Sequence, residues 1–172
     1  MSSPLVEWTL SQFQSVADAQ PEESPLKRID RDDSKLLEGD IRKRQAELRK
    51  ANYVGVQYVD HEEEAEGPEY NLRVEDVVGV RIEGLTAEGG EWGHIDPDGV
   101  DGVPFDGEGG LVQQLKSALY DDDVRKFPDA GRTGVDYTHL ELTNHAPQSH
   151  LWSSYHRYDF DVVFAEGYED LP

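Results

Sequence analysis

The stretch that decides the fold is "HRYDFDVVFA", residues 156–165. Aromatic or aliphatic side chains stand at every second position, and charged side chains fill the places between them in the first half. Because successive side chains of a β-strand point to opposite faces, this alternation predicts a strand with one face buried. The buried face would carry Tyr158, Phe160, Val162 and Phe164, with Arg157, Asp159 and Asp161 on the other face.

Three more segments show strand patterns. They are "YVGVQYVD" (53–60), "LRVEDVVGVRIEGL" (72–85) and a segment near 134–144 that precedes the strand at 152–165. In the second, Val78, Val80 and Ile82 would share one face, with Arg81 and Glu83 on the other. The connections "HEEEAEGPEY" (61–70) and "HAPQSH" (145–150) are predicted as turns, and "GYEDLP" (167–172) as a tail.

Helical periodicity occurs in three segments. It is found at 4–18, at 34–51 and in "GLVQQLKSALYDDDV" (110–124), where Leu111, Val112, Leu115, Ala118 and Leu119 fall on one side. The order α-α-β-β-α-β-β predicts an α+β fold, a mostly antiparallel sheet with one packed helix. We expect residues 1–50 to be an N-terminal helical arm with a linker and a basic helix. Residues 51–172 would form the α+β domain, with a long acidic, glycine-rich loop at 88–110.

The composition is strongly acidic. Of 172 residues, 37 are Asp or Glu and 16 are Lys or Arg, so the formal charge is -21. Such a surface is a poor partner for naked nucleic acid and suits concentrated salt, which screens self-repulsion. The absence of cysteine excludes disulfides, thiolate metal ligands and a cysteine nucleophile. No stretch approaches ~18 uninterrupted apolar residues, so no membrane span is expected.

Charge is also unevenly distributed along the chain. Nine of the basic residues lie between Lys27 and Lys50 together with six acids, so this window carries +3 and the remaining chain -24. One interpretation is a solvated helix with internal ion pairs. Another is a segment that docks on the acidic body of a neighbouring copy, and such head-to-tail contacts can close into rings. A third is contact with the phosphates of packaged DNA.

The stretch "HIDPDGVDGVPFDGEGG" (94–110) has the residue types of a calcium loop. Asp96 and Asp98 match the first two ligand positions, but Val100 occupies the third, and Glu108 comes one place late. The preceding "TAEGGEWG" has no helical pattern. A solvated excursion that orders against a partner is therefore the favoured interpretation.

The histidines raise a second metal hypothesis. "HEEEA" (61–65) fails the zinc-protease pattern because Ala65 stands where the second histidine belongs. In a hairpin of the last two strands, one register would set His139 opposite His156 and His145 opposite His150, with Glu141 as the nearest carboxylate. Because the same face carries Val135, Tyr137, Tyr158 and Phe160, packed core histidines are the competing interpretation. No catalytic, cofactor or metal residues are assigned, and no enzyme activity is expected.

The last two-fifths of the chain resembles a known family. The helix "GLVQQLKSALYDDDV", the turn "AGRTG" and the strands "VDYTHLELTNH" and "HRYDFDVVFA", within 109–165, resemble the tail-terminator (tail-completion) proteins of long-tailed phages and their archaeal-virus relatives. The first hundred residues depart from the compact family pattern, which leaves other neck, tail or baseplate roles open.

The resemblance implies a structural virion protein of the tail or neck. It would form an oligomeric ring, usually a hexamer, that joins the tail tube to the head connector without catalysis. The implied partners are other copies, the tail-tube protein and the head–tail connector protein, with packaged DNA only in passage. Assembly would take place in the host cytoplasm, and the acidic composition suits a virus of a halophilic archaeon. The alternatives are a metal-binding or metal-dependent soluble protein of a halophile and a cytoplasmic adaptor without a ligand.

Overall fold

The computed structural model describes residues 4–19, 26–29, 52–66, 71–85, 104–105, 108–119, 137, 139–147 and 155–170. Helix α1 spans Pro4–Ala19 and helix α4 spans Leu111–Leu119. The strands are β1 (Leu26–Ile29), β2 (Asn52–Glu66), β3 (Asn71–Leu85), β4 (His139–Pro147) and β5 (Tyr155–Asp170).

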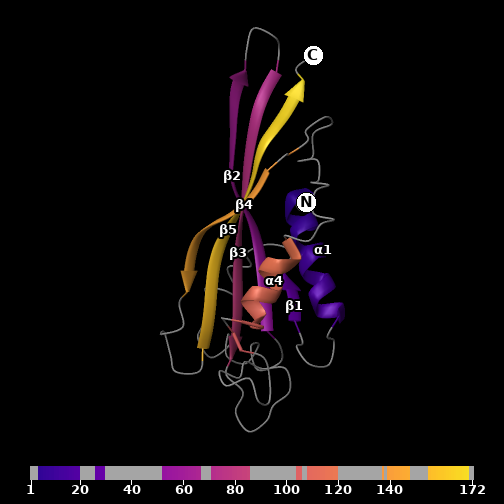
Figure 1. Ribbon diagram of the computed structural model, residues 1–172, viewed down its shortest axis with the longest axis vertical. Helices are drawn as coiled ribbons and strands as arrows, with labels where there is room; N and C mark the ends of the chain where they lie inside the picture. The colour runs from indigo at the N-terminus through magenta and orange to yellow at the C-terminus, as the bar shows by residue number, and fades with distance from the viewer. Residues whose placement is uncertain are drawn as a thin grey trace.

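The five strands form one sheet in the order β1-β2-β3-β5-β4. Strand β1 is parallel to β2, and every other neighbouring pair is antiparallel. The predicted α+β class with a mostly antiparallel sheet is therefore confirmed. The long strands β2, β3 and β5 run side by side through the centre of the molecule (Figure 1).

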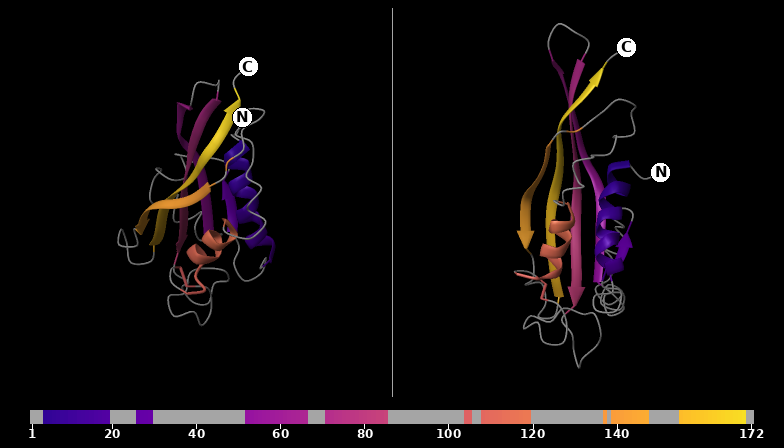
Figure 2. Two further views of the ribbon diagram at one scale, coloured as in Figure 1. Left: turned by 45° about the horizontal axis from the view of Figure 1, so that its top comes forward. Right: turned by 45° about the vertical axis from the view of Figure 1, so that its right-hand side comes forward.

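Both helices lie on one face of the sheet (Figure 2). The predicted alternation of the last strand is confirmed, because Tyr158, Phe160, Val162 and Phe164 are buried beneath the helices. Helix α4 buries Leu111, Val112, Leu115 and Leu119 against the same core. At about 25 cal/mol per Å² of buried apolar surface, this shared core is the main source of stability.

Helix α1 is an integral part of that core. Leu5, Leu10 and Phe13 are fully buried in the cluster that also holds the sheet and α4 residues. The hydroxyl of Thr9, also buried, donates to the backbone oxygen of Leu5 at 2.7 Å. Residues on both sides of the expected domain division at residue 50 thus share one hydrophobic core.

The two strands that flank β3 each carry one extra residue near the level of Asp76. In β2 the extra residue is Val59, because Tyr58 pairs with Val78 and Asp60 with Val77. In β5 it lies between Phe164 and Gly167. Beyond this level residues 60–66, 71–76 and 164–170 form a three-stranded ribbon, here called the extension, which projects past the helices (Figure 1).

Four predicted boundaries were wrong. Residues 61–66 were expected in a charged turn and 167–170 in a tail, but they pair with β3 in the extension. Residues 145–147 were expected in a turn but belong to β4, and strand β1 lies within the segment 19–34 that was expected to be a linker. In all four places cross-strand hydrogen bonds, which the side-chain types do not reveal, override a local composition typical of turns.

Glu83 also departs from expectation. It lies on the sheet face away from the helices, as predicted, yet only 1% of its surface is exposed. The predicted basic helix at 34–51 and most of the acidic loop at 88–110 lie outside the described residues.

Candidate functional site

A buried carboxylate lies where the extension leaves the core. Asp76 of β3 is on the helix-bearing face and is fully buried. It accepts hydrogen bonds from the hydroxyls of Tyr58 and Tyr137, and its Oδ1 contacts Nδ1 of His61. Burying an ionised carboxylate is costly unless donors surround it. These donors come from β2 and from the segment before β4, so Asp76 ties three parts of the chain together.

The histidine of this cluster lies between two carboxylates. Its Nδ1 faces Asp76, while its Nε2 is 2.9 Å from Oε1 of Glu63. In a catalytic triad the second ring nitrogen faces a hydroxyl nucleophile instead. With both ring nitrogens directed at carboxylates, the arrangement of His61 supports cohesion of the strands rather than nucleophile activation.

The side chain of Tyr137 passes over Gly167 of β5 to reach Asp76. A Cβ atom added at Gly167 of β5 would lie 2.9 Å from one ring carbon of Tyr137 and 3.0 Å from another. The ring also packs edge-on against Phe164, with centroids 5.7 Å apart. Gly167 is therefore the residue that lets the tyrosine ring approach the strand closely enough to donate to Asp76.

Replacing Gly167 by alanine is expected to lower the free energy of unfolding by about 1–3 kcal/mol, since the added methyl group overpacks the Tyr137 ring. Urea unfolding of the single and double variants with Tyr137→Ala checks this. In the Tyr137→Ala background the alanine should cost little, because the clashing ring is gone. Equal costs in both backgrounds would contradict the proposed contact.

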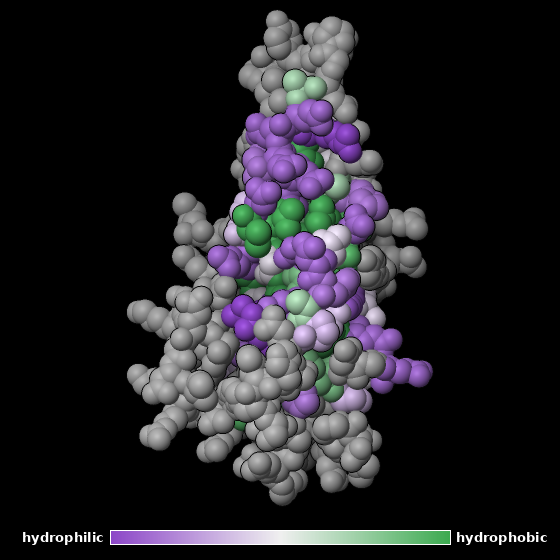
Figure 3. Space-filling view, turned by 90° about the vertical axis from the view of Figure 1, so that its left-hand side faces the viewer, coloured by the Kyte–Doolittle hydropathy of each residue, from purple (hydrophilic) through white to green (hydrophobic). Residues whose placement is uncertain are grey.

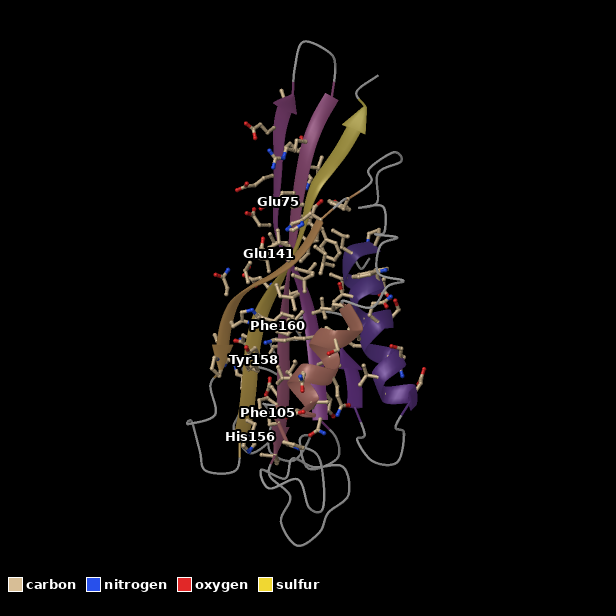
Figure 4. All side chains as sticks on the ribbon, viewed as in Figure 1. Glu75, Phe105, Glu141, His156, Tyr158 and Phe160 are labelled. Atoms are coloured by element: carbon tan, nitrogen blue, oxygen red, sulfur yellow. The ribbon has the colours of Figure 1, made fainter. Side chains whose placement is uncertain are left out.

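A second group surrounds the side chain of Lys116 on α4. Its Nζ is 2.7 Å from the Tyr158 hydroxyl and lies 4.2 Å from that ring's centroid. The ring of His145 stacks on Phe160, with centroids 6.1 Å apart. Figure 4 shows Tyr158 and Phe160 directed toward α4. Cation–π and aromatic contacts of this kind fix a helix on a sheet, and no reactive group is assembled here.

His156 lies under the residues that lead into α4. Its ring is 5.2 Å from that of Phe105, measured between centroids, and Figure 4 shows the two near each other. Phe105 is fixed because its backbone oxygen accepts from the Val112 nitrogen at 3.0 Å. Burial lowers the pKa of His156 below its ordinary value of 6.5, since an apolar setting disfavours the imidazolium.

This shift predicts a pH dependence of stability. The unfolded chain binds a proton at His156 near pH 6.5, whereas the folded chain binds it only at lower pH, so stability falls as pH decreases below about 6.5. Below the pKa of His156 in the folded chain, the free energy of unfolding should no longer depend on pH through this group. Unfolding of the parent and His156→Gln between pH 7.5 and 5.5 should show a stability difference that changes with pH. The control Ser15→Ala, at an exposed position and without a titratable group, should keep the parent slope. Identical slopes for His156→Gln and the parent would refute the assignment.

The predicted pairing of His139 with His156 is wrong. His139 lies opposite Ala165, and His156 pairs with Gly84 of β3. The hairpin register differs because β5 continues to Asp170, which sets β4 against a later part of that strand. His145 stands at the irregularity between Thr143 and Ala146, and His150 lies outside the described residues.

Other metal-site candidates find no support in the part of the chain that the structure describes. There, no three His, Asp or Glu side chains are placed to hold a metal ion. Asp96, Asp98 and Asp101 of the calcium-like stretch lie outside it. Among the same residues, no helix is long and apolar enough to cross a membrane.

The sheet face opposite the helices, here called the open face, bears a hollow of about 150 Å³. Its lining includes Gly55, Gly79, Arg81, Asp159 and Asp161. Nε of Arg81 is 3.2 Å from Oδ1 of Asp159.

More ion pairs and hydrogen bonds border the hollow. Nη2 of Arg157 lies 2.7 Å from Oδ2 of Asp159, and Nδ2 of Asn144 donates to Oδ2 of Asp161 at 2.7 Å. Asn144 has a φ of 55°, a left-handed conformation that asparagine tolerates at a bulge. Figure 3 shows this face, with hydrophobic surface near its middle between hydrophilic side chains.

The Asp76 cluster was not predicted, although the sequence contains a signal for it. In "VEDVVGVRI" the buried positions 74, 78, 80 and 82 are apolar, and Asp76 falls at the one interrupted place in that period. A charged residue at a core position calls for hydrogen-bond donors. Which donors supply them depends on the extra residue in β2, which the sequence pattern does not show.

Comparison of the sequence with protein-family models and with curated proteins finds no match.

Proposed function

We propose that this chain is a structural protein of the tail or neck of a tailed virus, where it forms a ring, as a hexamer, between the tail tube and the head connector. In this proposal it performs no catalysis, and packaged DNA touches it only in passage. The observation that carries the proposal is the extension. It supports an assembly role because the part of this three-stranded ribbon beyond the buried Val74 and Phe164 projects past the helices, with residues 61–65 exposed.

The composition of the extension agrees with this role. Residues 61–65 are all exposed, and Glu62 lies opposite Glu75 across β2 and β3. Like charges placed directly opposite each other destabilise a sheet. This repulsive pair is explained when the surface of the extension contacts neighbours, in an environment of high salt.

The resemblance of residues 109–165 to tail terminators supplies the identity of those neighbours. The structure has the helix-then-hairpin order of that resemblance, with α4 followed by β4 and β5. The fold class alone does not specify a function. The tail-tube and connector proteins are therefore proposed on the resemblance, and the tendency to assemble is proposed on the extension.

Light scattering and electron microscopy of the purified chain in molar salt test the proposal. We expect rings of uniform copy number and binding to the tail-tube protein. A variant that joins Glu64 directly to Arg73 through an Asn-Gly turn removes the far end of the extension while keeping the Asp76 cluster and the buried Val74. It should fold and fail to form rings, whereas Glu62→Gln, which keeps the backbone intact, should form them. The proposal would be overturned if the parent chain is strictly monomeric and does not bind the tail-tube protein.

A further inference from the structure

The open face carries a projecting side chain directly beside a hollow. Val59, the extra residue of β2, is 54% exposed, the highest value among large hydrophobic side chains in the described part of the chain. Its Cγ2 lies 3.0 Å from the position that a Cβ atom of Gly79 would occupy, and Gly79 lines the hollow. A hydrophobic projection and a depression of about 150 Å³ are therefore neighbours on one surface.

We propose that the open face binds a second copy of this chain back to back, with Val59 of each copy seated in the hollow of the other. In a contact around a two-fold axis both copies use the same surface patch. That patch must therefore carry both the projecting side chain and the depression that receives it. On this patch Val59 supplies the projecting side chain, and the hollow lined by Gly55 and Gly79 supplies the depression that receives it. Gly79 matters because a side chain there would displace Val59 of its own chain, whose Cγ2 lies 3.0 Å from the position of the added Cβ atom.

Charge also favours a second copy on this face. The chain carries -21 overall, so most of its surface repels another copy. Around the hollow, however, Arg81 and Arg157 balance Asp159 and Asp161. Because these four charges sum to zero and are paired within one copy, a second copy meets no net charge at the hollow itself. The exposed Asp60 beside Val59 is the charge that high salt must screen. The half-buried Val77 and Val163, paired beside Val59, extend the apolar part of this face.

The dimensions of the face indicate how strong the contact would be. Four strands spaced ~4.8 Å apart, each contributing about seven residues of ~3.3 Å, give a flat area of roughly 450 Å². Standard specific complexes bury about 800 Å² of accessible surface on each partner. We therefore expect a dimer that forms and dissociates with concentration. This inference is independent of the ring proposed above, because a two-fold contact can join isolated copies or two stacked rings.

Sedimentation in molar salt across a hundredfold concentration range tests the contact. The parent should pass from monomer to dimer, or from ring to paired rings, and Val59→Asp should raise the dissociation constant of that step at least tenfold. Ser15→Asp is the matched control, because it adds the same charge on the exposed side of α1. Since Val59 is exposed, both variants should keep the parent's thermal unfolding midpoint.

A cross-linking experiment gives an independent readout. The chain has no cysteine, so Val59→Cys introduces a single thiol. Near the two-fold axis two such thiols should form a disulfide on mild oxidation, whereas Ser15→Cys should not. The proposal is overturned if Val59→Asp associates like the parent, if the parent shows no such step, or if both cysteine variants cross-link equally. If the parent forms this dimer but no rings, only the ring of the proposed function is refuted.

Discussion

Replacing Asp76 by alanine is expected to lower the free energy of unfolding by about 3 kcal/mol. The carboxylate is fully buried and accepts from two tyrosine hydroxyls, while His61 contacts it from β2. Hydrogen bonds to a charged group contribute about 1.5–3 kcal/mol each, and removing the shared acceptor leaves donors unsatisfied. The sum is limited because Tyr58 is 37% exposed and can bond to water after the change.

Thermal unfolding in molar salt measures the effect. For a chain of this size a loss of about 3 kcal/mol corresponds to a fall in Tm of roughly 6–12 °C. Asp76→Asn keeps one acceptor oxygen and should cost less than Asp76→Ala. Glu141→Ala, at an exposed position of β4, should change stability by less than about 0.5 kcal/mol. If Asp76→Ala is as mild as Glu141→Ala, the cluster does not hold the strands together.

Replacing Phe13 by alanine is expected to cost about 3–5 kcal/mol, the range for truncating a buried aromatic side chain. Phe13 is fully buried, and it belongs to α1, which was predicted as part of an N-terminal arm. An independent arm could lose this ring without altering the unfolding of the remaining chain. In the structure the ring contributes to the core shared with the sheet and α4, so the whole cooperative transition should shift.

Urea unfolding followed by tryptophan fluorescence checks this prediction. Ser15→Ala, on the exposed side of the same helix, serves as the control and should change stability by less than about 0.5 kcal/mol. A single transition at lower urea for Phe13→Ala is the expected result. A separate early transition with the main one unmoved would show that α1 unfolds independently of the core.

The sequence predicted the buried core residues better than the ends of the strands. Alternation identified the buried side chains of β3 and β5, and helical periodicity identified those of α4, because burial on one face requires these periods. The end of β2 at 61–66 was missed since "HEEEAE" has the composition of a solvated turn. Its strand conformation comes from backbone pairing with β3, which leaves no mark in side-chain polarity.

The candidate clusters show a similar division. Asp76 interrupts the series of apolar residues on the buried face of β3, so the sequence pattern alone could have identified it as a buried polar residue. Its partners His61 and Tyr137 could not be selected, because they meet it only through the extra residue in β2 and the close approach at Gly167. The pairing of His139 with His156 failed for the related reason that a hairpin register depends on the strand lengths.

The extra residues in β2 and β5 constrain how this chain can change in evolution. Because of Val59, Tyr58 and His61 stand three positions apart yet share the helix-bearing face, and the interval from Phe164 to Gly167 in β5 has the same length. Losing one residue from either interval would turn every later side chain of that strand to the opposite face. In descendants of this chain, insertions and deletions within these two intervals should therefore be eliminated by selection more strictly than substitutions of the exposed residues there.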